Sequence, residues 1–315
     1  MKKLNAGEFL KKYNLLVLLL VFIVISSVLS PNFLKVNNML NMMQQCAIPG
    51  IIAIGMTIVI TLGGIDLSVG GVAAFSGMIT SMMVADGTNI FVSVAAGIIL
   101  GGILGLVTGV LISKCGLPDF ITTMAMLQIA RGASLLVTKG SPIFGLSEKF
   151  HVIGGGKAAN MIPIAGLIWI GLTILVFLMM KYTTFGRSLY AIGGNREAAG
   201  LSGIKVKRNY TIAYVMCAAL AGFAGVMTAS YLSTGQPTAC NGYELDAIAA
   251  SVIGGASLAG GISNVIGTFG GVVLLQIITN IFNLVGISSF YQQIAKGAII
   301  IIALLLNKAV SIKKD

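Results

Sequence analysis

The 315-residue chain is 57% hydrophobic and only 9% charged, whereas a soluble domain carries roughly 25% charged residues. Its mean hydropathy is +0.98, and its apolar runs are long enough to cross a bilayer, which takes about 20 helical residues. These values exclude a soluble enzyme, and the net charge of +11 does not indicate a nucleic-acid partner, because the basic residues lie between apolar runs.

The hydropathy pattern predicts an all-α protein, a polytopic transmembrane helical bundle that we treat as one domain over residues 1–315. The basic N-terminus and the apolar run after it are also typical of a signal peptide, but the many later spans favour a retained first helix. The third and eighth segments below are short and rich in glycine, so eight full spans with two partial ones are the alternative. About ten segments are expected, at 15–30, 40–62, 67–85, 91–113, 119–138, 162–180, 209–231, 246–260, 264–284 and 290–306.

The distribution of charge predicts the orientation of these segments. With the N-terminus in the cytoplasm and the segments alternating, the cytoplasmic stretches hold 14 of the 20 basic residues. Membrane proteins concentrate lysine and arginine in cytoplasmic loops, so both termini are expected in the cytoplasm. The sequence thus predicts a multi-pass protein of a bacterial inner membrane.

Two loops are long, the outer loop 139–161 and the cytoplasmic loop 181–208, which is the most polar stretch of the chain. A short helix is expected from Ala191 to Ala199, with Asn195 as a cap and Glu197 near its start. Apolar residues beside Arg196 make a small amphipathic surface there. This surface is either a docking site for a soluble partner or an ordinary solvated loop.

A weak internal repeat relates two glycine-rich segments. The stretch Gly63 to Gly71 is similar to the stretch Gly254 to Gly261, with one gap. Glycine-interrupted apolar segments in matching positions of two halves are typical of transporter sites. The alternative is that glycine, with 41 residues in the chain, serves close helix packing.

Residues for catalysis or metal binding are sparse. The four cysteines form no C-x-x-C pair, and His151 has no potential ligand partner nearby in sequence, so we expect no metal and no cofactor. The phosphate-binding motif G-x-x-x-x-G-K-[ST] is absent, because the one Gly-Lys step, at Gly156, is followed by alanine. If ATP drives this protein, another chain hydrolyses it.

Polar side chains recur at helical spacing inside the apolar segments, where they are costly unless they are paired or functional. Amides donate and accept hydrogen bonds at once, which suits a hydroxyl-rich solute, although hydrogen bonds between helices are the alternative use. Asp66 either caps the following helix or binds a coupling ion. The stripes are Asn37, Asn41 and Gln45; Gln128 and Arg131; Gln276, Asn280 and Asn283; and Gln292 and Lys296. The candidate translocation path comprises Asn41, Gln45, Asp66, Gln128 and Asn280.

Four stretches resemble the permease subunit of ribose-type ABC sugar importers, and the resemblance covers nearly the whole chain. They begin at Asn38 (N-M-L-N-M-M-Q-Q, continuing to G-G-I-D-L-S-V-G-G), at Arg131 (R-G, then T-K-G-S-P-I), at Gly186 (G-R-S-L-Y-A-I-G-G-N, then E-A-A and L-S-G-I) and at Asp246 (D-A-I-A-A, then V-I-G-G and S-L). Gly200 departs from the pattern, where a larger and often basic residue is expected.

The resemblance implies a homodimeric permease in the lipid bilayer that is not itself an enzyme. Two ATP-binding cassette ATPase subunits would dock inside, a periplasmic sugar-binding protein would dock outside, and the solute would be a monosaccharide, ribose first. Loop 181–208 would be the ATPase-coupling loop. The coupling residues it implies are Gly193, Gly194, Asn195, Arg196, Glu197, Ala198, Ala199, Leu201 and Gly203.

Three other functions stay open at this point. A permease of the same family could carry another pentose or hexose, a nucleoside or an autoinducer-like polyol. An ion-coupled secondary transporter needs buried ionisable partners, and Asp66 and Arg131 are few. A membrane-embedded enzyme would need clustered nucleophile, base or metal ligands, and the sequence offers none.

Overall fold

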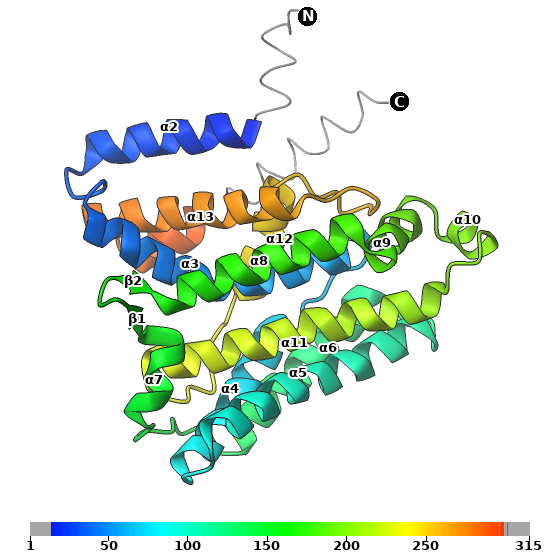
Figure 1. Cartoon of the computed structure of the whole chain (residues 1–315), viewed down its shortest axis with the longest axis horizontal. Helices are drawn as coiled ribbons and strands as arrows, with labels where there is room; N and C mark the ends of the chain where they lie inside the picture. The colour runs from blue at the N-terminus through cyan, green and yellow to red at the C-terminus, as the bar shows by residue number, and fades with distance from the viewer. Residues whose placement is uncertain (1–13, 296, 299–300, 302–315) are drawn as a thin grey trace, which may run out of the picture.

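The computed structural model describes residues 14–295, 297–298 and 301, and in this part the chain is a bundle of long helices (Figure 1). The two strands, β1 (Lys157–Ala158) and β2 (Ile162–Pro163), form a small antiparallel hairpin. The helices are α2 (Asn14–Leu29), α3 (Val36–Thr61), α4 (Val69–Ala85), α5 (Ile90–Ser113), α6 (Asp119–Leu136), α7 (Glu148–Gly155), α8 (Ile164–Tyr182), α9 (Thr184–Gly194), α10 (Arg196–Leu201), α11 (Val206–Leu232), α12 (Tyr243–Ile253) and α13 (Val265–Val285).

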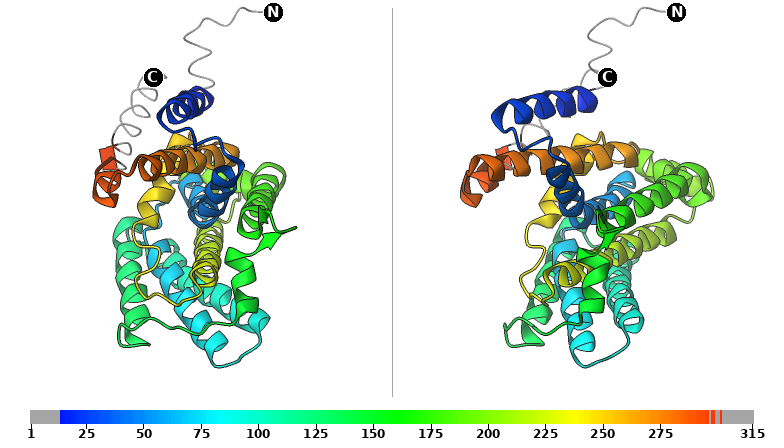
Figure 2. Two further views of the ribbon diagram at one scale, coloured as in Figure 1. Left: turned by 90° about the vertical axis from the view of Figure 1, so that its left-hand side faces the viewer. Right: turned by 60° about the vertical axis from the view of Figure 1, so that its left-hand side comes forward.

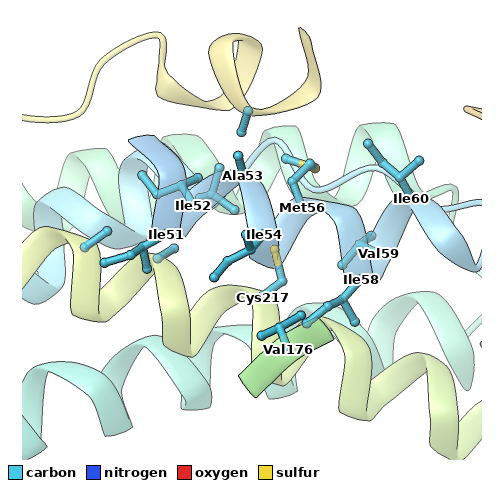
Figure 3. Packing of buried hydrophobic residues seen from close by; sticks show 14 of the residues in the cluster. Ile51, Ile52, Ala53, Ile54, Met56, Ile58, Val59, Ile60, Val176 and Cys217 are labelled. Carbon is cyan, nitrogen blue, oxygen red and sulfur yellow. The ribbon is translucent and has the colours of Figure 1, made fainter. Parts of the chain in front are cut away.

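Helices α3 and α11 form the centre of the bundle. Figure 2 shows α2 and α13 on one side of them and α4, α5 and α6 on the other. From Cys46 to Thr61, every residue of α3 except the half-buried Pro49 is buried. Its branched side chains interlock with α8 and α11 around Ile54, Val176 and Cys217 (Figure 3). Since lipid tails are as apolar as the core, this interlocking, rather than water exclusion, holds the helices together.

Helix α5 shows why the chain needs so much glycine. Gly97, Gly101, Gly105 and Gly109 recur every four residues and therefore share one face of the helix. All four are buried, and a Cβ on Gly101 would lie 2.5 Å from the Ala218 carbonyl oxygen of α11. The glycine stripe lets the two backbones approach closely, so the packing role of glycine is confirmed on this face.

The predicted segments agree with the helices except at two places. Helix α12 ends at Ile253 and has 11 residues, so the predicted segment 246–260 is wrong beyond that point. Such a helix is about half the length needed to cross a bilayer. The chain instead turns at Gly255, Gly260 and Gly261, which adopt left-handed φ angles of 95°, 86° and 75° that only glycine adopts readily. Residues 290–295, 297–298 and 301 of the predicted segment 290–306 are helical, and the rest of that segment lies outside the described residues.

Five of the described helices are long and apolar enough to cross a membrane: α3, α5, α8, α11 and α13. Helices α2 and α4 are apolar but shorter. Ten segments and two cytoplasmic termini therefore stay predictions.

Candidate functional site

The candidate coupling loop folds into two short helices, α9 and α10, at one end of the bundle (Figure 1). The Asn195 side-chain oxygen accepts a hydrogen bond from the Ala198 amide at 2.9 Å, so the predicted cap is confirmed. The single helix predicted from Ala191 to Ala199 is wrong, because Asn195 has extended backbone angles and separates α9 from α10. The small helix α7 and the β1–β2 hairpin lie at the opposite end of the bundle (Figure 1).

Helix α10 and the turn after it carry most of the implied coupling residues on an open surface. Arg196, Glu197, Ala198 and Gly203 are exposed, whereas Ala199 packs inward. Leu201 is 91% exposed, which is a large uncovered apolar side chain on a protruding turn. An apolar side chain ringed by charged and small residues is typical of the centre of a protein interface.

Gly200 does not disturb this surface. A Cβ there would meet nothing closer than a Val206 methyl group at 3.9 Å, and its φ angle is not left-handed. A larger residue would therefore fit at this position, and the departure from the family pattern leaves the helix geometry intact.

Gly193 joins the coupling helices to the core through backbone contacts. A Cβ on Gly193 would collide with the Thr61 carbonyl oxygen and with the Gly261 backbone nitrogen. The Gly261 amide donates a hydrogen bond to the same Thr61 oxygen at 2.9 Å, and Gly260 lies against the backbone of Gly63. We name this meeting of α9 with the turns after α3 and α12 the glycine junction, formed by Thr61, Gly63, Gly193, Gly260 and Gly261.

The glycine junction brings the two segments of the proposed repeat into contact. The correspondence does not extend along both segments, however. Gly70 and Gly71 lie inside α4, whereas their counterparts Gly260 and Gly261 lie in a turn. The local structures therefore match only at the ends of α3 and α12.

Two tyrosines of α11 make a second connection to the same turn. The Arg196 guanidinium lies over the Tyr210 ring, 4.7 Å from its centroid, and the Tyr210 hydroxyl donates to the Leu62 carbonyl at 3.1 Å. One helical turn further, the Tyr214 hydroxyl donates to Asp119 Oδ2 at 3.0 Å and lies 3.3 Å from the Ile65 carbonyl. Neither tyrosine was predicted from the sequence as a functional residue, although their four-residue spacing places them on one face of a helix.

Asp66 is fully buried in the turn between α3 and α4. Its Oδ1 accepts hydrogen bonds from the Ser68 amide at 2.9 Å and from the Ser68 hydroxyl at 2.6 Å. Asp66 therefore holds the turn that leads into α4, although the N-cap position of α4 itself is Ser68. The other carboxylate oxygen, Oδ2, has no hydrogen-bond partner among the described residues.

Two candidate path residues, Gln45 of α3 and Asn280 of α13, make hydrogen bonds across the contact between these helices. Asn38 and Asn280 exchange two hydrogen bonds, at 3.0 and 2.9 Å. Gln276 Nε2 donates to Gln45 Oε1 at 2.6 Å on an exposed part of the same helix contact. We name this contact the amide seam, formed by Asn38, Gln45, Gln276 and Asn280. Asn280 thus makes the interhelical hydrogen bonds that were the alternative to a solute contact.

The structure does not gather the five candidate path residues into one site. Asn41 is exposed on α3, near the amide seam in sequence, and Gln128 is exposed on α6. Helix α6 packs on α4 and α5, whereas α13 packs on α2, α3, α8 and α12. Gln128 is therefore separated from the seam, because α6 and α13 lie on different sides of the bundle (Figure 2). Asp66 is separated from it as well, because it lies in the turn beyond the C-terminal end of α3, whereas the seam lies in the N-terminal part of that helix.

The candidate set left out two charged residues, the half-buried Arg131 and the buried Glu244. Arg131 Nη1 donates to the carbonyls of Pro237 and Ala239, at 3.2 and 2.7 Å, and so fixes the segment that leads into α12. Arg131 Nη2 and Glu244 Oε2 have no hydrogen-bond partner among the described residues. A charge within an apolar segment was the signal available for Arg131.

Among the described residues there is no group of three histidine, cysteine or acidic side chains that could hold a metal ion. The His151 ring nitrogen Nδ1 lies 3.0 Å from the Ser230 carbonyl and 3.0 Å from the Ser233 hydroxyl. His151 therefore ties α7 to the end of α11.

Comparisons with known proteins agree with this architecture. Residues 38–304 match the family model described as "Branched-chain amino acid transport system / permease component". The ribose import permease RbsC of Escherichia coli (strain K12) is 42% identical over 302 residues, which is 95% of this chain and 94% of that protein.

The RbsC protein of Bacillus subtilis (strain 168) is 40% identical over 98% of this chain and 96% of its own length. The L-arabinose transport system permease AraH of Escherichia coli (strain K12) is 34% identical over 96% of this chain and 92% of its own. No solved structure matches the chain. The chain is thus a multi-pass inner-membrane protein that belongs to the family of ABC importer permease components, of the ribose type.

Proposed function

We propose that this chain is the membrane-spanning permease of an ATP-driven importer that carries ribose. The observation that carries this proposal is the 42% identity to a ribose import permease over 95% of the chain. The L-arabinose permeases are less similar, at 34–35% identity. Neutral amides such as Gln45 and Gln276 supply both donors and acceptors, as a sugar requires.

The permease acts as a single transmembrane unit of about ten segments with both termini in the cytoplasm, and two copies form the pathway. ATP is hydrolysed by a separate ATPase that docks on the C-terminal end of α9, from Gly193, and on α10. A periplasmic sugar-binding protein delivers the solute to the opposite end, which carries α7. The uncovered Leu201 and the placement of α10 and α7 at opposite ends of the bundle support docking on two faces.

Coupling follows from the contacts of α9 and α10. A push on α10 reaches the turn after α3 by two routes, through Gly193 onto Thr61 and through Arg196 and Tyr210 onto Leu62. That turn leads directly into α4. Because a ligand shifts an equilibrium only through contacts that differ between states, ATP binding acts by favouring one position of this turn.

The test is transport by the purified chain in proteoliposomes, reconstituted with its ATPase and its sugar-binding protein. Ribose should accumulate only when both partners and ATP are present, and L-arabinose should accumulate far less. A preference for another solute would make that solute the substrate in place of ribose, and the proposal of an ATP-driven importer would stand. Uptake by the chain alone, driven by a proton or sodium gradient, would contradict the proposal.

Docking on α10 is tested separately with two arginine variants. Ala198 and Thr184 are both small, exposed residues of the 181–208 segment, but only Ala198 lies on the proposed surface. Ala198→Arg should abolish ATPase binding and ribose uptake, because it places a bulky charge at the centre of the interface. Thr184→Arg should leave both near normal. Normal ATPase binding by Ala198→Arg would contradict docking on α10.

A further inference from the structure

A cavity of about 630 Å³ opens between the end of α5, the turn after α10 and the start of α11. Its charged lining residues are all basic: Lys114, Lys205, Lys207 and Arg208. No carboxylate lies among the residues that line it. Four cations around one hollow repel one another unless an anion occupies it, so the cavity is electrostatically suited to a negatively charged group.

The start of α11 adds to the positive potential of this cavity. Its cap residue, Lys205, makes no side-chain capping hydrogen bond, and its first turn contains no acidic residue. The free amides of a helix N-terminus carry a partial positive charge and favour a nearby anion. The N-terminus of α11 therefore adds to the positive potential that the four basic side chains create in the cavity.

The walls of the cavity are apolar. Ile204, Val206 and Ile212 line it between the basic side chains, and all three are half-buried. A small hydrated anion gains nothing from such walls, whereas the glycerol backbone and first methylenes of a lipid bury apolar surface there.

An apolar stripe leads from the cavity along α5. Ile103, Val107, Val110 and Lys114 follow one another at spacings of four, three and four residues, so they share one face of the helix. Ile103 and Val107 are 51% and 43% exposed. Helix α5 is also the least buried of the five spanning helices. The stripe thus provides an uncovered track for an acyl chain, with the cationic cavity at its end.

We infer that this cavity binds an anionic phospholipid, with its phosphate among Lys114, Lys205, Lys207 and Arg208 and an acyl chain along the Ile103–Val110 face of α5. Basic hollows at the membrane boundary are a recognised way to hold anionic headgroups. Gly200 and Ile204 connect the cavity to α10. Any effect of the bound lipid on the ATPase-coupling helix α10 rests on the proposed function, whereas lipid binding to the cavity does not.

The experiment measures bound lipid by native mass spectrometry of the purified full chain. The probes are cardiolipin, phosphatidylcholine and inorganic phosphate. Cardiolipin should stay bound through release from detergent, phosphatidylcholine should not, and inorganic phosphate should not displace cardiolipin. In the variant Lys205→Gln/Lys207→Gln the affinity should fall about thirty-fold, since each cation near an anionic surface contributes about a factor of five.

The matched control is Lys181→Gln/Arg187→Gln, which removes two positive charges from the same end of the helical bundle (Figure 1). It should lower cardiolipin binding by far less than the test variant. Equal losses in the two variants, equal binding of phosphatidylcholine, or displacement by inorganic phosphate would overturn the inference.

The binding test does not depend on transport. A chain that carries another solute, or that fails to bind an ATPase, would still retain cardiolipin in the parent form and lose it in Lys205→Gln/Lys207→Gln.

Discussion

The two ends of helix α3 are attached to their neighbours by different kinds of contact. At its N-terminal end, amide side chains of Asn38 and Gln45 meet those of Asn280 and Gln276 across the amide seam. At its C-terminal end, the backbone of Thr61 meets the backbones of Gly193 and Gly261 directly at the glycine junction, and the Thr61 hydroxyl lies 2.6 Å from the Ser263 hydroxyl.

The difference indicates how each end responds to force. Amide pairs are rotatable and exchange partners with water or a sugar at modest cost, so the seam is suited to parting. The backbones packed at the glycine junction have no space to slide past one another, so the junction is suited to moving as one body with α9 and α10. Our account is that ATP-driven motion enters at the junction and opens the bundle near the seam.

The largest expected effect is that of a side chain added inside the glycine junction. Gly193→Val should abolish ribose uptake, because its Cβ collides with Thr61 and Gly261 and the overpacking costs about 1–3 kcal/mol. Gly171→Val in α8 is the control, since a Cβ there also meets nothing within 4 Å and Gly171 is not one of the implied coupling residues. Uptake and membrane abundance are measured together for both variants. Similar losses in both would break the distinction between the two glycines.

Removing the Tyr210 hydroxyl should give the next largest effect. Tyr210→Phe keeps the ring under Arg196 but leaves the Leu62 carbonyl without this donor, which costs about 1–3 kcal/mol. We expect ATPase binding to persist while sugar transported per ATP hydrolysed falls several-fold.

The matched control for that variant is Tyr231→Phe, at the other end of α11. Its ratio of transport to hydrolysis should not change. An unchanged ratio in Tyr210→Phe would remove the tyrosine route and leave the glycine junction as the sole connection.

A double-mutant cycle sharpens the seam side of the comparison. Asn38→Leu and Asn280→Leu should each destabilise the chain by about 1–2 kcal/mol, because each removes both hydrogen bonds of the reciprocal pair. The double variant should recover about 1 kcal/mol of that loss, since neither amide remains. Denaturant unfolding in detergent supplies the free energies. Strictly additive losses would mean that the two amides do not interact.

The smallest expected effect on stability is at the exposed end of the seam. Gln45→Ala removes a solvent-accessible pair with Gln276, so the free energy of unfolding should change by about 0.5 kcal/mol or less. If Gln45 contacts the sugar, ribose uptake should fall although stability does not. A loss of stability without a loss of uptake would assign Gln45 to packing alone.

The sequence predicted the helices better than it predicted the contacts between them. Apolar runs predicted the long helices, and the capping residue Asn195 indicated the start of α10. Both features depend only on the local sequence. A partial eighth segment was among the alternatives, but the end of α12 at Ile253 was not located, since Ile253 to Gly261 continues an apolar composition and only three-dimensional packing shows the turn. Asn280 was read as a path residue because composition cannot distinguish an amide that faces a solute from one paired with Asn38.

Pulsed electron paramagnetic resonance tests the central claim most directly, on the reconstituted importer with labelled protomers diluted among unlabelled ones. One spin-label pair is placed on the exposed residues Ala191 and Ala259, beside the glycine junction and outside the implied coupling residues, and the other on the exposed residues Asn41 and Asn283, beside the amide seam. On addition of ATP, we predict that the Ala191–Ala259 distance stays constant while the Asn41–Asn283 distance changes. A shift at Ala191–Ala259 with a constant distance at Asn41–Asn283 would contradict this prediction.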